Sequence, residues 1–375
     1  MEEIKVSQLA IDAINRKPAK GIPTFFVNLM DIDLIEEIAG VEKGKYFENP
    51  EEVYIKFQKS IGVDCLDQFI PKNPMEMGKE GFDSKVKRTP TTGANRIIID
   101  GIEINSPEAV VEHMERFVFP SIEKSIKQFN EEKVIEEIIK REKQLQKKLA
   151  PILKTGHGFV PFPYLRYTYY GYVNYFCAYA LYPEVMEKDF SLQADYAEIH
   201  NKAIVKAYKK GNLPPMYRLD HDMADSRGTL VNIKSLEKIW LPHFQRAIKP
   251  LVDAGINLIW HCDGNLMQMI PLLIEAGVKG FQGFQYETGM DYEKICKMKT
   301  KDGQSFIIIA GVSVTKTLPY GTPEEVKKEM EYLVENGPET GLFLSASSSI
   351  TPNTNRENIL TFIEGLKYYR KRGKR

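Results

Sequence analysis

The segment Asn257-Leu258-Ile259-Trp260-His261-Cys262-Asp263-Gly264-Asn265 joins a short apolar run to a group of polar residues. An apolar run of this length is typical of a strand that is buried on both faces of a parallel sheet. Similar runs recur along the chain, with helical patterns between them. The predicted strands cover residues 22–27, 65–70, 158–163, 215–220, 257–262, 280–285, 306–311 and 342–347. Eight alternating strand and helix units predict a (β/α)8 TIM barrel of the α/β class.

Local patterns place helices and one hairpin around these strands. Thr322-Pro323-Glu324-Glu325 and Thr354-Asn355-Arg356-Glu357 have the spacing of a capping box, so we expect a helix to begin at each. Residues 96–104 hold Asp-Gly between β-forming residues and predict a hairpin inserted after the second strand. Residues 131–149 carry Lys and Glu at i,i+4 spacing and predict a solvated helix before the third strand. An N-terminal helical extension is expected before the first strand.

The bulk composition indicates a folded, soluble protein. The 375 residues are 43% hydrophobic and 27% charged, which is enough apolar material for a core. Lys plus Arg equals Asp plus Glu at 51 each, so no net charge attracts nucleic acid or a membrane. The four cysteines form no CxxC pair, which argues against a disulfide framework. With no secretory signal and no apolar run of ~18 residues, we expect a cytoplasmic protein with one domain over residues 1–375.

The carboxyl-terminal ends of barrel strands are where active sites form, and the fifth predicted strand ends in titratable residues. Because a strand alternates its faces, His261 and Asp263 point to one side and Cys262 to the other. His261 and Asp263 are therefore predicted to hold a metal ion together, or to act as an acid and its orienting partner. The alternative is a hydrogen bond between them that only anchors the end of the strand.

Other strand ends contribute further candidates. Asp220 and Asp222 face one way if the fourth strand continues through them, and we favour Asp222 as a second acid or ligand. Glu287 is a candidate metal ligand or acid, with a structural salt bridge as the alternative. The serines after the eighth strand have no neighbouring base, so they are expected to donate hydrogen bonds to a polar substrate rather than to act as nucleophiles. The residues expected to contact substrate or cofactor are Tyr164, Tyr167, Tyr170, Asn265, Gln285, Ser347 and Ser348.

Over nearly its whole length the chain resembles the uroporphyrinogen decarboxylase superfamily, whose fold is a (β/α)8 barrel. The segments that carry the resemblance are residues 261–265, 275–278, 321–325 and 350–358, in the family's order and spacing. The decarboxylases of haem synthesis have arginines near the N-terminus that hold substrate carboxylates, but the corresponding region here, residues 24–30, has none. The resemblance therefore does not imply decarboxylation of a porphyrinogen.

The resemblance points instead to the branch of corrinoid-dependent methyltransferases. In that branch a zinc ion is held by a His-x-Cys after the fifth strand and a Cys after the eighth. Here the three positions are His261, Asp263 and Ser348, so the thiolate ligands are absent. His261 and Asp263, with Asp222 or Glu287, are expected to bind zinc or a harder divalent metal.

These observations favour a methyltransferase or demethylase that moves a methyl group between a small methylated compound and a corrinoid (cobalamin) on a separate protein. The alternatives are a decarboxylase or lyase acting on a small aromatic or pyrrolic acid, and a non-catalytic corrinoid- or tetrapyrrole-binding protein. The expected partners are the methyl donor or acceptor, the corrinoid-binding protein and a second copy of the chain as a homodimer. No nucleic acid or membrane partner is expected.

Overall fold

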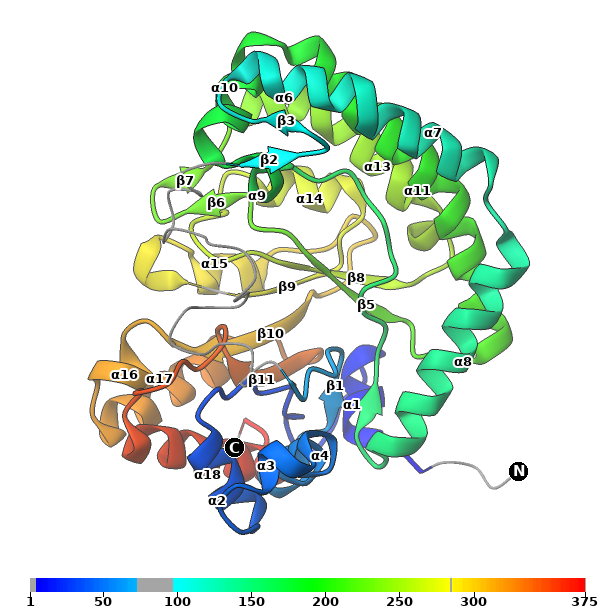
Figure 1. Cartoon of the computed structure of the whole chain (residues 1–375). Helices are drawn as coiled ribbons and strands as arrows, with labels where there is room; N and C mark the ends of the chain where they lie inside the picture. Colours follow the sequence, from blue (N-terminus) through cyan, green and yellow to red (C-terminus); the bar gives the residue numbers. More distant parts are fainter. Residues whose placement is uncertain (1–4, 73–96, 284, 375) are drawn as a thin grey trace.

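Five of the predicted strands pair side by side in the computed structural model, which describes residues 5–72, 97–283 and 285–374 (Figure 1). All neighbours in this sheet run parallel, in the order β11-β10-β9-β8-β5. The strands are β5 (Met216–Asp220), β8 (Asn257–His261), β9 (Gly280–Gln282), β10 (Ile307–Val312) and β11 (Leu342–Ala346).

Shorter parallel pairings close this sheet into a ring. β1 (Cys65–Leu66) pairs with β4 (Leu153–Lys154). Single parallel bridges join Phe25 to Cys65, Thr24 to Leu344 on β11, and Gly156 to Tyr217 on β5. These contacts lead from β11 through residues 24–25, β1 and β4 to β5. The five-stranded sheet then leads from β5 through β8, β9 and β10 back to β11. The described residues therefore form a closed parallel ring of eight strand positions, as the (β/α)8 prediction requires.

The third predicted strand was wrong. The chain pairs at β4 and Gly156, whereas residues 158–163 contain no strand. Pro161 and Pro163 lack the N–H that a ladder needs, so the apolar run of residues 158–163 cannot serve as a central strand. The strand at β4 was not predicted because a lysine is not expected at a buried strand position. Lys154 is buried there because Glu142, at 2.8 Å, compensates its charge.

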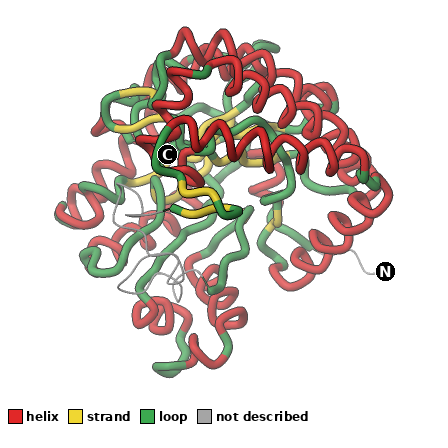
Figure 2. The backbone as a smooth tube through the Cα atoms, turned by 45° about the horizontal axis from the view of Figure 1, so that its top comes forward, coloured by secondary structure: helices red, strands yellow, loops and turns green. Residues whose placement is uncertain are grey.

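Helices lie around the strands (Figure 2). The helix at the second predicted capping box begins one residue later than expected, since Asn355 and not Thr354 accepts hydrogen bonds from Glu357 and Asn358. The capping box at Thr322 and Glu325 is confirmed. The helices are α1 (Gln8–Ile14), α2 (Ile32–Ala39), α3 (Lys45–Glu48), α4 (Pro50–Ile61), α6 (Pro107–His113), α7 (Phe119–Lys127), α8 (Glu131–Leu149), α9 (Tyr167–Tyr170), α10 (Tyr172–Leu181), α11 (Pro183–Gly211), α12 (Ile233–Ser235), α13 (Leu241–Asp253), α14 (Ile270–Ala276), α15 (Tyr292–Lys297), α16 (Thr317–Tyr320), α17 (Pro323–Asn336) and α18 (Arg356–Arg372).

The predicted hairpin is present. β2 (Ile98–Ile99) and β3 (Ile102–Glu103) are antiparallel, and Asp100 and Gly101 between them have φ of 49° and 80°. Two consecutive residues with positive φ are the feature of a type I′ turn, which suits the twist of a two-residue hairpin. The hairpin follows β1 in the chain and lies beside α6 (Figure 1). A second small hairpin, β6 (Ala224–Asp225) and β7 (Gly228–Thr229), follows β5.

Aromatic packing sets the orientation of β8. The Trp260 ring lies 6.1 Å from Trp240 and 5.4 Å from Phe244, which belong to the helical segment outside the ring. Because consecutive residues on a strand point to opposite sides, His261 points into the barrel. Among the described helices, none is long and apolar enough to cross a membrane.

Candidate functional site

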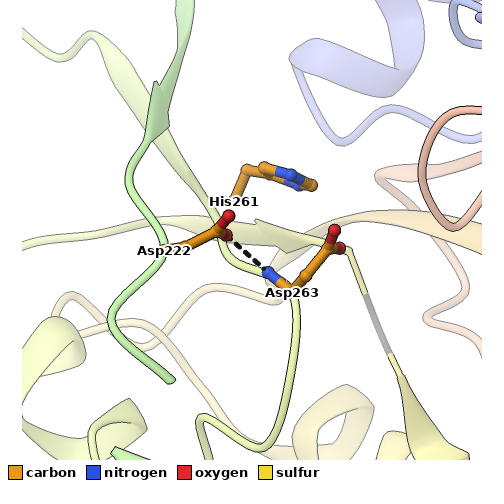
Figure 3. Close-up of side chains that lie close together, drawn as sticks. All are labelled: Asp222, His261 and Asp263. Atoms are coloured by element: carbon orange, nitrogen blue, oxygen red, sulfur yellow. Dashed lines mark hydrogen bonds between the residues drawn. The ribbon is translucent and has the colours of Figure 1, made fainter. Parts of the chain in front are cut away.

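Three side chains from two neighbouring strand ends meet at the carboxyl-terminal end of the barrel (Figure 3). Asp222 follows β5, His261 ends β8, and Asp263 follows it. One ligand atom from each lies within 4.8 Å of the other two. Asp263 donates its backbone N–H to Asp222 Oδ1 at 2.9 Å, which ties the two segments together. The sequence predicted this group of His261, Asp263 and Asp222, and the structure brings its members together.

The unpaired acceptor atoms of this cluster are suited to bind a divalent cation. Asp263 Oδ2 accepts a hydrogen bond from Ser348 Oγ at 3.2 Å, while Asp263 Oδ1 and His261 Nδ1 are buried and have no partner among the described residues. Buried polar atoms without partners are rare, because each one costs free energy. One imidazole and two carboxylates form a ligand set that zinc or a harder divalent metal accepts, with positions left for substrate.

Burial raises the pKa of the Asp263 carboxyl. His261 opposes this shift, the nearby Asp222 carboxylate adds to it, and the hydrogen bond from Ser348 lowers it again. A metal ion in the cluster would reverse the balance, because a bound cation favours the ionised carboxylate. The cluster is therefore electrostatically suited to a cation.

Gly283, after β9, sets the position of the His261 ring. Its φ is +88°, and a Cβ at this residue would lie 2.7 Å from His261 Nδ1. A side chain here would displace the imidazole, so the glycine is required by both the backbone conformation and the close approach.

Cys262 points away from the cluster, as the strand alternation predicts. Its sulfur accepts the backbone N–H of Met223 at 3.3 Å, and burial raises the pKa of its thiol. A buried thiol of raised pKa is a poor source of thiolate. Cys262 therefore does not supply a thiolate ligand to the site.

The other residues predicted from strand ends occupy different positions. Glu287 accepts hydrogen bonds from Ser313 at 2.9 Å and from Thr315, and the structure does not bring it into the three-residue cluster. Gln285 accepts the N–H of Gly264 at 2.9 Å, and Asn265 accepts the N–H of Met267, so both hold the loop after β8. Ser347 accepts the N–H of Val314 at 3.2 Å. Of the two serines, only Ser348 contacts the cluster.

The three tyrosines that were predicted to contact substrate or cofactor do not all lie at the cluster. Tyr167 donates its hydroxyl to the Asp222 carbonyl at 2.8 Å and stacks on His221, with ring centroids 5.8 Å apart. Tyr164 is 41% exposed and meets His221 edge-on at 6.1 Å. Tyr170 is buried and pairs with His113 at 2.9 Å, within the region of α6 and the hairpin. Tyr164 and Tyr167 thus lie beside the site, and Tyr170 does not.

A second polar network beside the cluster went unnoticed in the sequence. Arg218 on β5 donates to Asp67 after β1 at 2.6 Å, to Asp220 at 3.1 Å and to Gln282 on β9 at 3.3 Å. His261 is the strand partner of both Asp220 and Gln282, so the network and the metal-type cluster share one end of the barrel. Asp220 is on the same strand as Arg218, but Asp67 and Gln282 come from other strands, a relation that no local spacing reveals.

His221 gives the site a pH-dependent contribution to stability. Burial lowers the pKa of its imidazole to about 4, and its Nε2 accepts the N–H of Leu165 at 2.9 Å. In the unfolded chain the imidazole has a pKa near 6.5, so below that pH the unfolded state binds a proton that the folded state does not. We expect the free energy of unfolding to fall by about 1–2 kcal/mol between pH 7 and pH 5 on account of this group.

Denaturant unfolding of the wild type and His221→Gln at both pH values measures this contribution. The variant keeps an acceptor for Leu165 but cannot titrate, so its loss of stability on acidification should be smaller than that of the wild type. Equal losses in the two proteins would contradict the assignment.

Two surface cavities lie away from the cluster. One, of about 460 Å³, lies between the start of the first strand segment and the end of α18, near Ile22 and Lys371. The other, of about 500 Å³, lies between α8 and residues 158–161, near Arg141 and His200. Neither is lined by a residue of the cluster.

Comparisons with known proteins find a family model that is similar to the part of the chain that holds this cluster. Residues 222–369 match the model of the uroporphyrinogen decarboxylase (URO-D) family, a range that contains Asp222, His261, Asp263 and Ser348. No curated protein sequence matches the chain. Among solved structures, a methyltransferase from Methanosarcina mazei has 16% identity and a TM-score of 0.58, over 98% of this chain and 99% of that one.

Two further structures are more distant. A B12-independent methionine synthase from Shewanella sp. W3-18-1, in complex with selenomethionine, has 12% identity and a TM-score of 0.48 over 94% of this chain and 97% of that one. A putative vitamin-B12 independent methionine synthase from Listeria monocytogenes has 14% identity and a TM-score of 0.43 over the same shares. The M. mazei structure shows that the fold is shared along almost the whole chain. The family model confirms the predicted resemblance to the superfamily over residues 222–369.

Proposed function

From the premise that residues 222–369 match the uroporphyrinogen decarboxylase family, we propose that this protein is a metal-assisted methyltransferase. The methyl group would move between a small methylated compound and a reduced corrinoid on a separate protein. The single observation that carries the proposal is the cluster of Asp222, His261 and Asp263. Two of its buried atoms, His261 Nδ1 and Asp263 Oδ1, have no hydrogen-bond partner among the described residues. The similarity of fold to a methyltransferase supports it.

The residues have distinct tasks in this reaction. His261 and Asp263 would bind the metal, with Asp222 as the third ligand and Ser348 orienting the Asp263 carboxylate. A divalent metal bound there supplies a positive charge that holds or activates a heteroatom of the substrate. The methyl group would pass to a reduced corrinoid, which acts as a nucleophile, and the electron pair of the broken bond would remain on the substrate heteroatom.

A decarboxylase acting on a multiply carboxylated substrate is poorly supported. Such a substrate needs cationic side chains to hold its carboxylates. Arg218 is the arginine of the network at this end of the barrel, and it is already bound to Asp67 and Asp220.

The test uses the full chain loaded in turn with Zn²⁺, Mn²⁺ and Co²⁺. We incubate each form with chemically reduced cobalamin and a panel of methoxylated, methylthio and methylamino compounds, and follow methylcobalamin by absorbance. Product is expected with at least one class of substrate and should require metal. Asp225→Asn, which changes a carboxylate on the neighbouring hairpin, is the control and should retain the rate. Absence of product from the whole panel with every metal would contradict the proposal.

A further inference from the structure

Carboxylates outnumber cationic groups at the carboxyl-terminal end of the barrel. Asp67, Asp220, Asp222 and Asp263 all lie there, and Arg218 contacts two of them. His157 Nδ1 lies 3.8 Å from Asp67, but burial lowers the pKa of its imidazole and so favours the neutral ring. This excess is local, because the whole chain carries no net charge. A divalent metal would offset Asp222 and Asp263, and Arg218 offsets Asp67. One carboxylate, Asp220, then has no compensating charge of its own.

The Asp220 carboxylate is open to a ligand. Its side chain is 40% exposed, and its Oδ2 shares Arg218 with Asp67. The Arg218 and Asp67 pair beneath it is almost fully buried, at 6% and 1% exposure. Asp67 Oδ1 is buried without a hydrogen-bond partner among the described residues. Although burial opposes it, the positive charge of Arg218 lowers the pKa of Asp67, so the Asp67 carboxylate is compensated. The partly exposed Asp220 carboxylate is left to pair with a ligand.

Aromatic rings pack against His221, the residue between Asp220 and Asp222 in the chain. The neutral His221 ring, between Asp220 and Asp222, stacks on Tyr167 at 5.8 Å, and the Tyr167 ring lies 4.7 Å from that of Tyr172. Tyr164 and Tyr172 are 41% and 42% exposed. Aromatic faces beside a carboxylate are the environment that recognises alkylated ammonium groups, because the ring face attracts a cation whose methyl groups cannot be hydrated strongly.

We propose that the substrate of this site is a methylated ammonium compound, with Asp220 as its counter-ion and the exposed tyrosines as its walls. The inference rests on the proposed function and names its substrate class. In the transfer, the carbon–nitrogen bond breaks and its electron pair stays on nitrogen, so the ammonium leaves as a neutral amine and needs no proton. A hydroxyl or carboxylate elsewhere on the substrate is then available to the metal held by His261 and Asp263.

Binding to the metal-loaded full chain tests the charge requirement directly. Choline and 3,3-dimethylbutan-1-ol have the same shape and the same hydroxyl, and they differ in a nitrogen and its positive charge. By calorimetry, we expect choline to bind at least about tenfold more tightly than the neutral alcohol. Equal affinity, or tighter binding of the anionic 3,3-dimethylbutanoate, would overturn the inference.

Variants locate the effect. Asp220→Asn should lower choline affinity by about tenfold and leave the affinity for the neutral alcohol unchanged. Asp225→Asn, on the β6–β7 hairpin with Arg227 as its partner, should change neither. Thermal melting of both variants is the check that each of them is folded. If Asp220→Asn weakened both ligands equally, Asp220 would have only a structural role and the inference would be wrong.

The binding result is independent of turnover. Charge-dependent choline binding without methyl transfer to cobalamin would contradict the proposed function and leave the ligand class standing. Methyl transfer from methoxylated or methylthio compounds, with no preference for ammonium ligands, would support the proposed function and contradict the ligand class.

Discussion

Replacement of His261 with alanine is expected to remove the stoichiometric metal and to lower methyl transfer by more than about 100-fold. His261 supplies the one neutral ligand of the cluster, and without it Asp222 and Asp263 are left as two carboxylates held close together. Partners that only orient a ligand already contribute 10- to 100-fold to metal affinity, so loss of a ligand should cost more. Elemental analysis of the dialysed protein and the rate of methylcobalamin formation are the two measurements.

His243→Ala is the matched control for this experiment. His243 lies on α13, away from the three cluster residues, and should leave both the metal content and the rate unchanged. One equivalent of tightly bound metal in His261→Ala would show that the cluster is not the metal site.

Replacement of Arg218 with methionine is expected to lower the free energy of unfolding by about 3–5 kcal/mol. The Arg218 guanidinium lies 2.6 Å from Asp67, and both side chains are almost fully buried. Removing the cation leaves the Asp67 carboxylate desolvated and uncompensated, which is the costly way to break a buried ion pair. Urea denaturation at pH 7 measures the change.

Two further variants test whether the cost of Arg218→Met comes from the unpaired charge of Asp67 or from lost packing. Arg227→Met removes a cation that is 88% exposed from its pair with Asp225, and we expect a cost below about 1 kcal/mol. The double variant Arg218→Met with Asp67→Asn should recover part of the lost stability, because no charge is then left unpaired. A cost for Arg218→Met no larger than that for Arg227→Met would refute the buried-pair account.

Local sequence patterns predicted most of the barrel and the three residues of the candidate cluster. Runs such as residues 257–262 show burial on both faces, and His261 and Asp263 follow from strand alternation alone. The third strand was missed because burial of Lys154 depends on Glu142, twelve residues earlier on α8. A buried charge whose partner lies on a different element does not appear as an apolar residue in the sequence. The neighbouring run of residues 158–163 is more apolar and was therefore predicted as the strand.

The network around Arg218 could not be found for a related reason. Arg218 and Asp67 are separated by 151 positions and become neighbours only when β1 and β5 enter the same ring. Glu287 shows the opposite failure. Its type and its place after the sixth strand suited a ligand, but Ser313 and Thr315 on the next loop bind its carboxylate instead. The residue type of Glu287 allows it to bind a metal, but the contacts made by the neighbouring loop determine its role.

The closure of the ring at Thr24 also constrains how the protein is made. Residues 24–25 pair on one side with β1, about forty positions later, and on the other side with β11, about three hundred and twenty positions later. During synthesis the first strand position therefore keeps an open edge until nearly the whole chain has left the ribosome. Contacts of such long sequence separation form late and slowly. An unpaired strand edge can pair with other chains, so the ring is open to such contacts until β11 docks beside residue 24.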